Sequence, residues 1–157
     1  IVAGDIDIGF LIGPFTAPGI DSRTILSERF VAVLPEAHPL AAKRRINLAE
    51  LSDQPFILGA SAYWGPYRRL VDELCLGAGF TPRVVQEAHN SDGIFGLVAA
   101  GMGVSIYVEG ARNFSLRGCT IRPFKGLDAN IETTAVWRAD NPSPVIANFV
   151  KILEVSA

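Results

Sequence analysis

Phe56-Ile57-Leu58 is a run of three apolar residues, and Gly59-Ala60-Ser61 follows it directly. The apolar run predicts a short buried strand, and the turn after it leads to a stripe of apolar residues at helical spacing. The stripe consists of Tyr67, Leu70, Val71, Leu74, Cys75 and Ala78. Pro66 suits the first position of this helix and Gly79 suits the position just past its end. The stretch therefore predicts a strand, a turn and an amphipathic helix.

The same alternation extends in both directions along the chain. Further strands are predicted at 6–12, 24–34, 83–88, 104–106, 119–123 and 131–137. Helices are predicted at 47–51 with Asn47 as its cap, at 91–100 with Ser91 as its cap, and from Ser143-Pro144 onward. The last helix is expected to bury Val145, Phe149, Ile152 and Leu153, and the small residues Gly96, Ala99 and Ala100 are expected to bring helix 91–100 close to a sheet.

Alternating strands and helices predict an α/β fold in which helices cover parallel sheets. In such folds ligands bind at the carboxyl ends of the strands, where the following helices present their first N–H groups. The sequence thus predicts a ligand site after strand 56–58 and after strand 83–88.

Composition and charge narrow the possible functions. The chain has 157 residues, of which 49% are hydrophobic and 19% charged, and its formal net charge is -2. Because the densest basic run is only Lys43-Arg44-Arg45, direct contact with DNA is not expected. Cys75 and Cys119 match no metal or redox spacing, so we expect a buried free thiol at Cys75, no metal and no cofactor. No apolar run is long enough for a membrane span, and nothing at the amino end resembles a signal peptide, which together predict a cytoplasmic protein.

Several segments in a fixed order resemble the effector-binding domain of LysR-type transcription regulators. The segments are Gly4-Asp5-Ile6-Asp7-Ile8-Gly9-Phe10, Glu28-Arg29-Phe30-Val31-Ala32-Val33-Leu34-Pro35 with His38-Pro39-Leu40-Ala41, Leu51-Ser52-Asp53-Gln54-Pro55-Phe56-Ile57, Ala78-Gly79-Phe80-Thr81-Pro82 and Gly96-Leu97-Val98-Ala99-Ala100-Gly101-Met102-Gly103-Val104. Each segment alone is unspecific, but their order and spacing together indicate the family. The family segment with His38 implies an architectural role for this residue.

The resemblance implies two Rossmann-like lobes joined by crossing strands, similar to periplasmic solute-binding proteins of type 2. Lobe one would comprise 1–22 and 121–157, and lobe two 27–120. Ile1 to Gly4 is interpreted as the last turn of a helix, so the chain is expected to lack the start of lobe one. The family's proteins form homodimers or homotetramers and bind DNA through an amino-terminal helix-turn-helix domain, which lies outside this sequence.

In relatives a small effector binds in the cleft between the lobes, and for this chain the best physical candidate is an organic anion. The positions that match are Ile12, Gly13, Ser61, Gly65, Tyr67, His89, Asn90 and Ser91. Ordinary structural roles remain open for each: Ser61 and Ser91 as helix caps, Tyr67 as a core residue, and Ile12 as a packed strand residue. Trp64 is interpreted either as a lid or as an interface residue.

Catalysis is not expected. A triad of Ser61, His89 and Asp92 can be written down, but the chain has no Gly-x-Ser-x-Gly turn to expose the serine. The alternative is a stand-alone solute-binding protein, or an enzyme such as a dehydratase, on the same two-lobe fold. The family segments favour the regulator, and the exposed face of helix 67–78, with Arg68 and Arg69, is a candidate surface for self-association.

Overall fold

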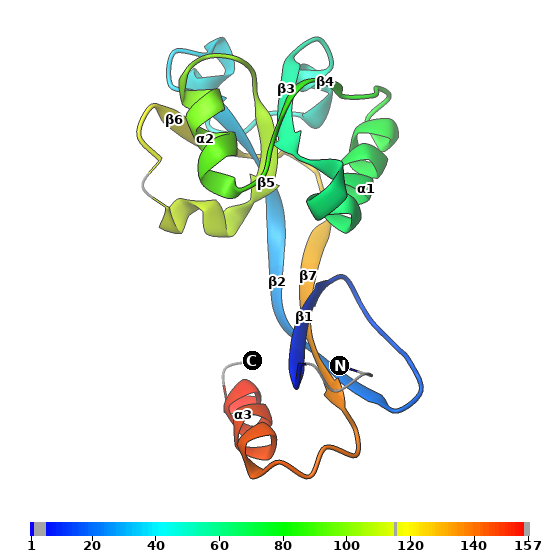
Figure 1. Cartoon of the computed structure of the whole chain (residues 1–157). Helices are drawn as coiled ribbons and strands as arrows, with labels where there is room; N and C mark the ends of the chain where they lie inside the picture. Colours follow the sequence, from blue (N-terminus) through cyan, green and yellow to red (C-terminus); the bar gives the residue numbers. More distant parts are fainter. Residues whose placement is uncertain (2–5, 115, 156–157) are drawn as a thin grey trace. The chain divides into compact units, whose positions relative to one another are not determined.

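The computed structural model describes residues 1, 6–114 and 116–155 (Figure 1). The chain forms two compact units, each described here by itself: unit 1 comprises Ile1–Glu28 and Asn130–Ala157, and unit 2 comprises Arg29–Ala129. The predicted lobe boundaries concern the family's complete domain and stay a prediction. The predicted helix end at Ile1 to Gly4 falls largely on residues 2–5, outside the described residues.

Unit 2 contains a parallel pair of strands with a helix between them. β3 (Pro55–Gly59) and β4 (Arg83–Ala88) run parallel, with Gly59 opposite Ala88, and α1 (Ser61–Gly77) connects them. Gly103 is needed beside this pair, because a Cβ there would lie 2.4 Å from the carbonyl oxygen of Pro55. The close approach lets Val104 form a parallel bridge with Phe56.

The second sheet of unit 2 is antiparallel, which differs from the expected parallel pairing. The carboxyl-terminal half of β2 (Ile20–Pro35) lies between β5 (Ser105–Val108) and β6 (Cys119–Pro123) and pairs antiparallel with both. The short 3-10 helices η1 (Pro39–Ala42) and η2 (Leu48–Leu51) follow β2 and lead to β3, and the partner strands β5 and β6 come only after β4 in the chain. The hydrophobic pattern locates these strands but carries no information on their direction.

The helix α1 confirms the predicted stripe and begins earlier than predicted. Tyr67, Val71 and Cys75 are buried. The helix starts at Ser61 because a first turn precedes a kink at Trp64, whose φ of -112° and ψ of 20° are not helical. Pro66 therefore lies just after the kink, and Gly79, at a φ of +88°, follows the end of the helix as predicted.

The helix α2 (Ser91–Ala99) covers the core of unit 2 with Ile94, Phe95 and Val98. Its predicted contact through small residues is only partly right: a Cβ at Gly118 would lie 3.0 Å from that of Ala99, so these two positions do approach closely. Gly96 is instead exposed, because it lies on the face of α2 opposite the core residues. Each fully buried aliphatic side chain in such a core stabilises the fold by about 1.5–3 kcal/mol relative to exposure.

Polar side chains organise the turns between β2 and β3. The Glu50 carboxylate accepts a hydrogen bond from the backbone N–H of Asn47 at 2.9 Å, which confirms Asn47 as the start of η2. The Nδ1 of His38 accepts from the N–H of Leu40 at 3.2 Å, and its Nε2 lies 3.1 Å from Gln54 Oε1. The structural role predicted for His38 is therefore confirmed.

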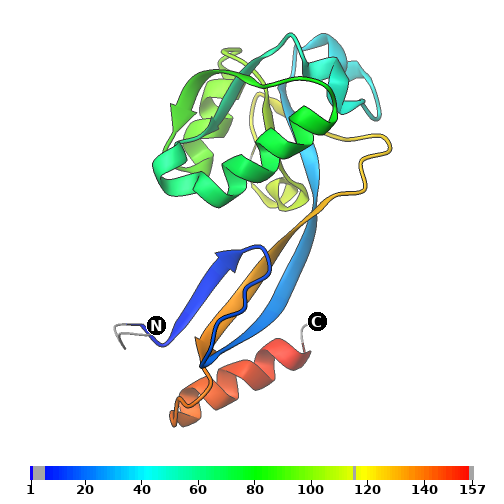
Figure 2. The ribbon, with the colours of Figure 1, turned by 90° about the vertical axis from the view of Figure 1, so that its right-hand side faces the viewer.

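Unit 1 contains β1 (Ile8–Ile12), β7 (Asn130–Arg138), the first half of β2 and α3 (Pro144–Val155). β1 and β7 are antiparallel, and the order of the strands is β1-β7-β2 (Figure 2). The predicted buried stripe of α3 is partly wrong: Ile146 is buried, whereas Val145 and Ile152 are exposed. The helix carries more apolar residues than one face can bury, and the face with Ile146 and Phe149 packs inward, Phe149 against Phe10 at 6.4 Å between ring centroids.

Candidate functional site

The two helices of unit 2 begin at the same edge of the parallel pair. β3 and β4 end together at Gly59 and Ala88, and the N–H of Ala60 donates to the carbonyl of Ala88 at 2.8 Å. α1 then begins at Ser61 and α2 at Ser91. The structure thus confirms that the segments with Ser61 and Ser91 follow neighbouring parallel strands, and we call their shared end of the sheet the β3/β4 edge.

The amino terminus of α1 has no side-chain cap. Its N-cap residue is Ala60, whose carbonyl accepts from the N–H groups of Tyr63 and Trp64, both at 2.9 Å. The exposed Ser61 occupies the first helical position rather than the cap. Because the first N–H groups of a helix point outward and carry partial positive charge, this terminus favours an anion.

The amino terminus of α2 is capped by Asn90, not by Ser91. The side-chain oxygen of Asn90 accepts from the N–H of Gly93 at 2.8 Å, so the prediction of Ser91 as the cap is wrong. The extended backbone of Asn90, with a φ of -142°, places its side chain over the first turn. Ser91 is thereby available for a different contact: its hydroxyl lies 2.7 Å from the hydroxyl of Tyr107.

Tyr107 is the site residue that the sequence analysis missed. It lies on β5, which continues from the parallel bridge between Phe56 and Val104. Its strand was predicted to end at Ile106, two residues before the end of β5. A tyrosine directly after Ser105 and Ile106 continues the strand pattern and brings a hydroxyl to the carboxyl end, which is the signal that could have identified it.

Aromatic rings pack behind the β3/β4 edge. Trp64 contacts Tyr67 at 5.7 Å and Tyr107 at 6.1 Å between ring centroids, and Phe95 contacts Tyr107 at 5.0 Å. The buried Tyr67 donates its hydroxyl to the carbonyl of Ile106 at 3.0 Å. Tyr67 is therefore a core residue, as its structural interpretation predicted. Its ring also packs against that of Tyr107, with ring centroids 6.1 Å apart.

Trp64 has a packing role in unit 2, while its interpretation as a lid or as an interface residue stays a prediction. Its Nε1 donates to the carbonyl of His89 at 3.1 Å, which connects the kink of α1 to the loop before α2. Its ring lies over Gly59, where a Cβ would come within 2.3 Å of the indole. Gly59 is thus required for the position of the ring.

His89 and Gly65 complete the predicted residues in unit 2. His89 is exposed, and its ring centroid lies 5.5 Å from that of Tyr63. Gly65 follows the kink at Trp64, and a Cβ there would meet no atom within 4 Å. His89 therefore belongs to the rim of the β3/β4 edge.

Ile12 and Gly13 belong to unit 1. Ile12 ends β1 and is 41% exposed, which argues against ordinary strand packing. Gly13 has a φ of +87°; its N–H donates to the carbonyl of Glu132 and its carbonyl accepts from the hydroxyl of Thr134, both at 2.8 Å. Their participation in ligand binding stays a prediction.

Other kinds of site are not apparent in the described part of the chain. Among its residues, no three His, Cys, Asp or Glu side chains group together as they would around a metal ion. Cys75 and Cys119 are both free and buried, as predicted for Cys75. Burial, reinforced by the nearby Asp72 carboxylate, raises the pKa of the Cys75 thiol to about 12. The described helices are too short or too polar to cross a membrane.

Known proteins resemble the chain over nearly its whole length. The model of the LysR substrate binding domain family matches residues 1–156, so the chain belongs to this family. The HTH-type transcriptional regulator AlsR of Bacillus subtilis is 33% identical over 152 residues, which are 97% of this chain and 50% of that protein. The chain spans about half the length of the curated relatives that it matches first.

Solved structures confirm the predicted two-lobe fold of the effector-binding domains. The BenM effector binding domain with its effector benzoate matches with a TM-score of 0.83 and 23% identity, over 98% of this chain and 70% of that one. Full-length CbnR complexed with its target DNA matches with a TM-score of 0.87 and 21% identity, over 99% of this chain and 54% of that one. The family is one of transcription regulators rather than enzymes, so the solute-binding and enzyme alternatives are not favoured.

Proposed function

We propose that this chain is the effector-binding part of a LysR-type transcription regulator and that it binds a small organic anion at the β3/β4 edge. One observation carries the proposal: α1 and α2 begin side by side, directly after the neighbouring ends of β3 and β4. Two helix amino termini at one edge supply N–H donors and partial positive charge to the same ligand. Membership of the family supports the proposal.

A carboxylate fits this edge better than a neutral ligand. The hydroxyl of Ser61 is exposed at the first position of α1, and the paired hydroxyls of Ser91 and Tyr107 lie at the start of α2. Hydroxyl groups can donate to a carboxylate or accept from a ligand hydroxyl. The rings of Trp64 and Tyr107 support an aromatic ligand body, and the benzoate bound by BenM is an aromatic carboxylate.

The proposed mechanism is a shift between conformations. A ligand that binds one conformation of the regulator more tightly than another raises the population of the first. We propose that the regulator is a cytoplasmic homodimer or homotetramer, that it contacts DNA through a separate helix-turn-helix domain, and that it binds its ligand without transforming it. The family and the CbnR structure with target DNA support this assignment.

Thermal unfolding of the full protein with a panel of small carboxylates tests the proposal. A ligand at 100 times its dissociation constant adds about 2.7 kcal/mol to the free energy of unfolding. We expect one class of carboxylate to raise the melting temperature, Ser91→Ala to reduce this shift strongly, and the exposed Ser27→Ala to leave it unchanged. A shift that survives both Ser61→Ala and Ser91→Ala would place the ligand elsewhere and contradict the proposal.

A further inference from the structure

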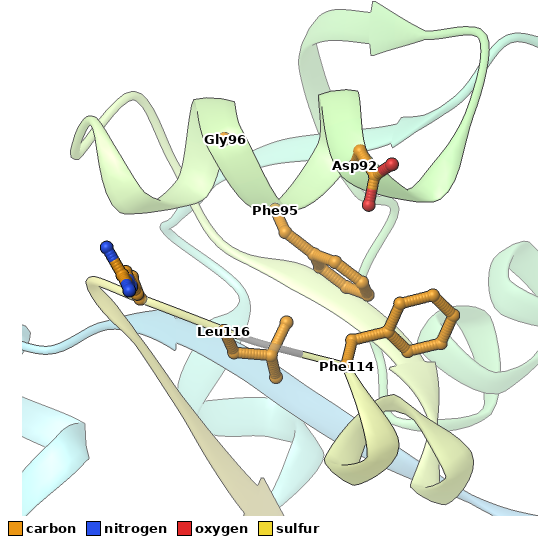
Figure 3. A pocket seen from close by; sticks show the side chains of 6 residues that line it. Asp92, Phe95, Gly96, Phe114 and Leu116 are labelled. Atoms are coloured by element: carbon orange, nitrogen blue, oxygen red, sulfur yellow. The ribbon is translucent and has the colours of Figure 1, made fainter.

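A pocket lies on the outer side of α2, within unit 2. Its volume is about 320 Å³, which is enough for a small metabolite. Figure 3 shows the side chains around it, contributed by α2 and by the segment between η3 (Glu109–Asn113) and β6. The lining residues are Asp92, Phe95, Gly96, Phe114, Leu116 and Arg117.

Gly96 keeps this pocket open. It lies inside α2, where glycine weakens a helix relative to alanine. A Cβ at Gly96 would meet no atom within 4 Å, so neither packing nor backbone conformation requires a glycine here. The missing side chain exposes the helix backbone to the pocket, and any larger residue would project into this space.

Two phenyl rings form the apolar wall. Phe95 and Phe114 pack edge to face, with ring centroids 5.6 Å apart, and Leu116 lies below them in Figure 3. Phe114 remains 48% exposed although it belongs to this cluster. A half-exposed ring beside an open helix surface offers contact area to a flat or apolar ligand.

Opposite charges line the same pocket. Both Asp92 and Arg117 are exposed, and within the described part of the chain neither side chain has a hydrogen-bond or ion-pair partner. Asp92 and Gly96 are four residues apart on α2, so the carboxylate lies on the open face one turn from the glycine. A ligand with an ammonium group and a carboxylate would pair with both side chains.

We propose that this pocket binds a small zwitterion with an apolar body, of the class of aromatic amino acids. The ammonium group donates to the Asp92 carboxylate, the ligand carboxylate accepts from the Arg117 guanidinium, and the apolar body lies against Phe95 and Phe114 over Gly96. The pocket shares Phe95 with the aromatic rings behind the β3/β4 edge, but neither Ser91 nor Tyr107 lines it. The regulator would then respond to two ligands of different chemistry.

Isothermal titration calorimetry on the full protein tests the proposal with three related probes. L-phenylalanine carries both charges, 3-phenylpropanoate lacks the ammonium group, and 2-phenylethylamine lacks the carboxylate. We expect L-phenylalanine to bind. The dissociation constant of each of the other two probes should be at least about tenfold higher, since each loses one charged hydrogen bond. Equal binding of all three probes, or no binding of L-phenylalanine at about 10 mM, overturns the proposal.

Variants locate the binding. Gly96→Leu should abolish the binding of L-phenylalanine, whereas Gly77→Leu, at a helical glycine that also has no atom within 4 Å of its Cβ position, should leave it unchanged. Arg117→Gln should lower the affinity for L-phenylalanine about tenfold and leave the affinity for 2-phenylethylamine unchanged. This second variant tests the site even if Gly96→Leu fails to fold. Loss of binding in Ser91→Ala with full binding in Gly96→Leu would assign the amino acid to the β3/β4 edge and contradict a second site.

Discussion

The hydroxyl oxygens of Ser91 and Tyr107 lie 2.7 Å apart, one at the first residue of α2 and the other on β5. Asn90, the residue before Ser91, caps the helix by accepting a hydrogen bond from the N–H of Gly93. The Ser91 hydroxyl is therefore not used as the cap and can contact Tyr107. It joins the helix start to the strand across the proposed ligand site. A ligand at the β3/β4 edge therefore meets a fixed pair of hydroxyls.

The first prediction concerns this pair. Ser91→Ala and Tyr107→Phe should each lower the free energy of unfolding by about 1 kcal/mol, the usual contribution of one hydrogen bond. The double variant should lose less than the sum, because both single changes remove the same contact. Urea unfolding of the four proteins measures this coupling; strictly additive losses would mean that the hydroxyls do not interact.

A second prediction concerns Gly59 beneath the ring of Trp64. Gly59→Ala should lower the free energy of unfolding by about 1–3 kcal/mol, because the new Cβ overlaps the indole and forces it to move. It should also shift the fluorescence of Trp64. Gly65→Ala is the matched control, since a Cβ there meets nothing within 4 Å. Similar losses in both variants would contradict the packing role of Trp64.

A third prediction separates Arg68 from Arg69, which the sequence analysis both assigned to the exposed face of α1; for Arg68 this is wrong, because its side chain is only 14% exposed. Arg68 is held inside unit 2: its Nη1 donates to the carbonyl of Gly59 at 3.0 Å and to the Glu87 carboxylate at 2.6 Å. Arg68→Glu should therefore cost about 2 kcal/mol of stability, since it removes bonds of a charged donor. Its effect on self-association would be confounded by this loss.

Arg69 is the better probe of the proposed association surface, because it is exposed. Arg69→Glu should change the free energy of unfolding by no more than about 0.5 kcal/mol. It should weaken self-association of the full protein. Sedimentation velocity measures the association. An unchanged sedimentation profile for a stably folded Arg69→Glu protein would remove this face of α1 from the interface.

A fourth prediction uses the thiol of Cys75. Burial raises its pKa to about 12 from an ordinary value of 9.0, so the thiol stays protonated in the folded protein. The stability that this contributes is present below pH 9 and lost as the pH rises toward 12. At about pH 8 iodoacetamide should label Cys75 far more slowly in the native protein than in urea, because the thiolate is the nucleophile. Equal labelling rates in mass spectrometry would contradict its burial.

Much of the fold could be predicted because its elements have local signals. Strand 83–88 and strand 119–123 were predicted with the bounds that β4 and β6 have, since apolar runs and turn residues delimit them. The kink at Trp64 and the antiparallel pairing of β2 had no such signal. Both depend on contacts between distant segments, such as the hydrogen bond from Trp64 to His89.

The candidate site was predicted at the level of segments rather than of single atoms. The rule that ligands bind after parallel strands identified Ser61 and Ser91. Asn and Ser are both preferred N-cap residues, so the adjacent pair Asn90 and Ser91 does not indicate which of the two caps α2. Tyr107 was missed because its role arises only when β5 is placed beside α2.

The most direct test of the central claim is hydrogen–deuterium exchange of the full protein with and without a carboxylate that raises its melting temperature. We predict slower exchange in peptides that cover residues 60–67 and 89–95, the starts of α1 and α2, and no change in peptides that cover η2. Protection confined to other peptides, with residues 60–67 and 89–95 unchanged, would show that the β3/β4 edge does not bind the ligand.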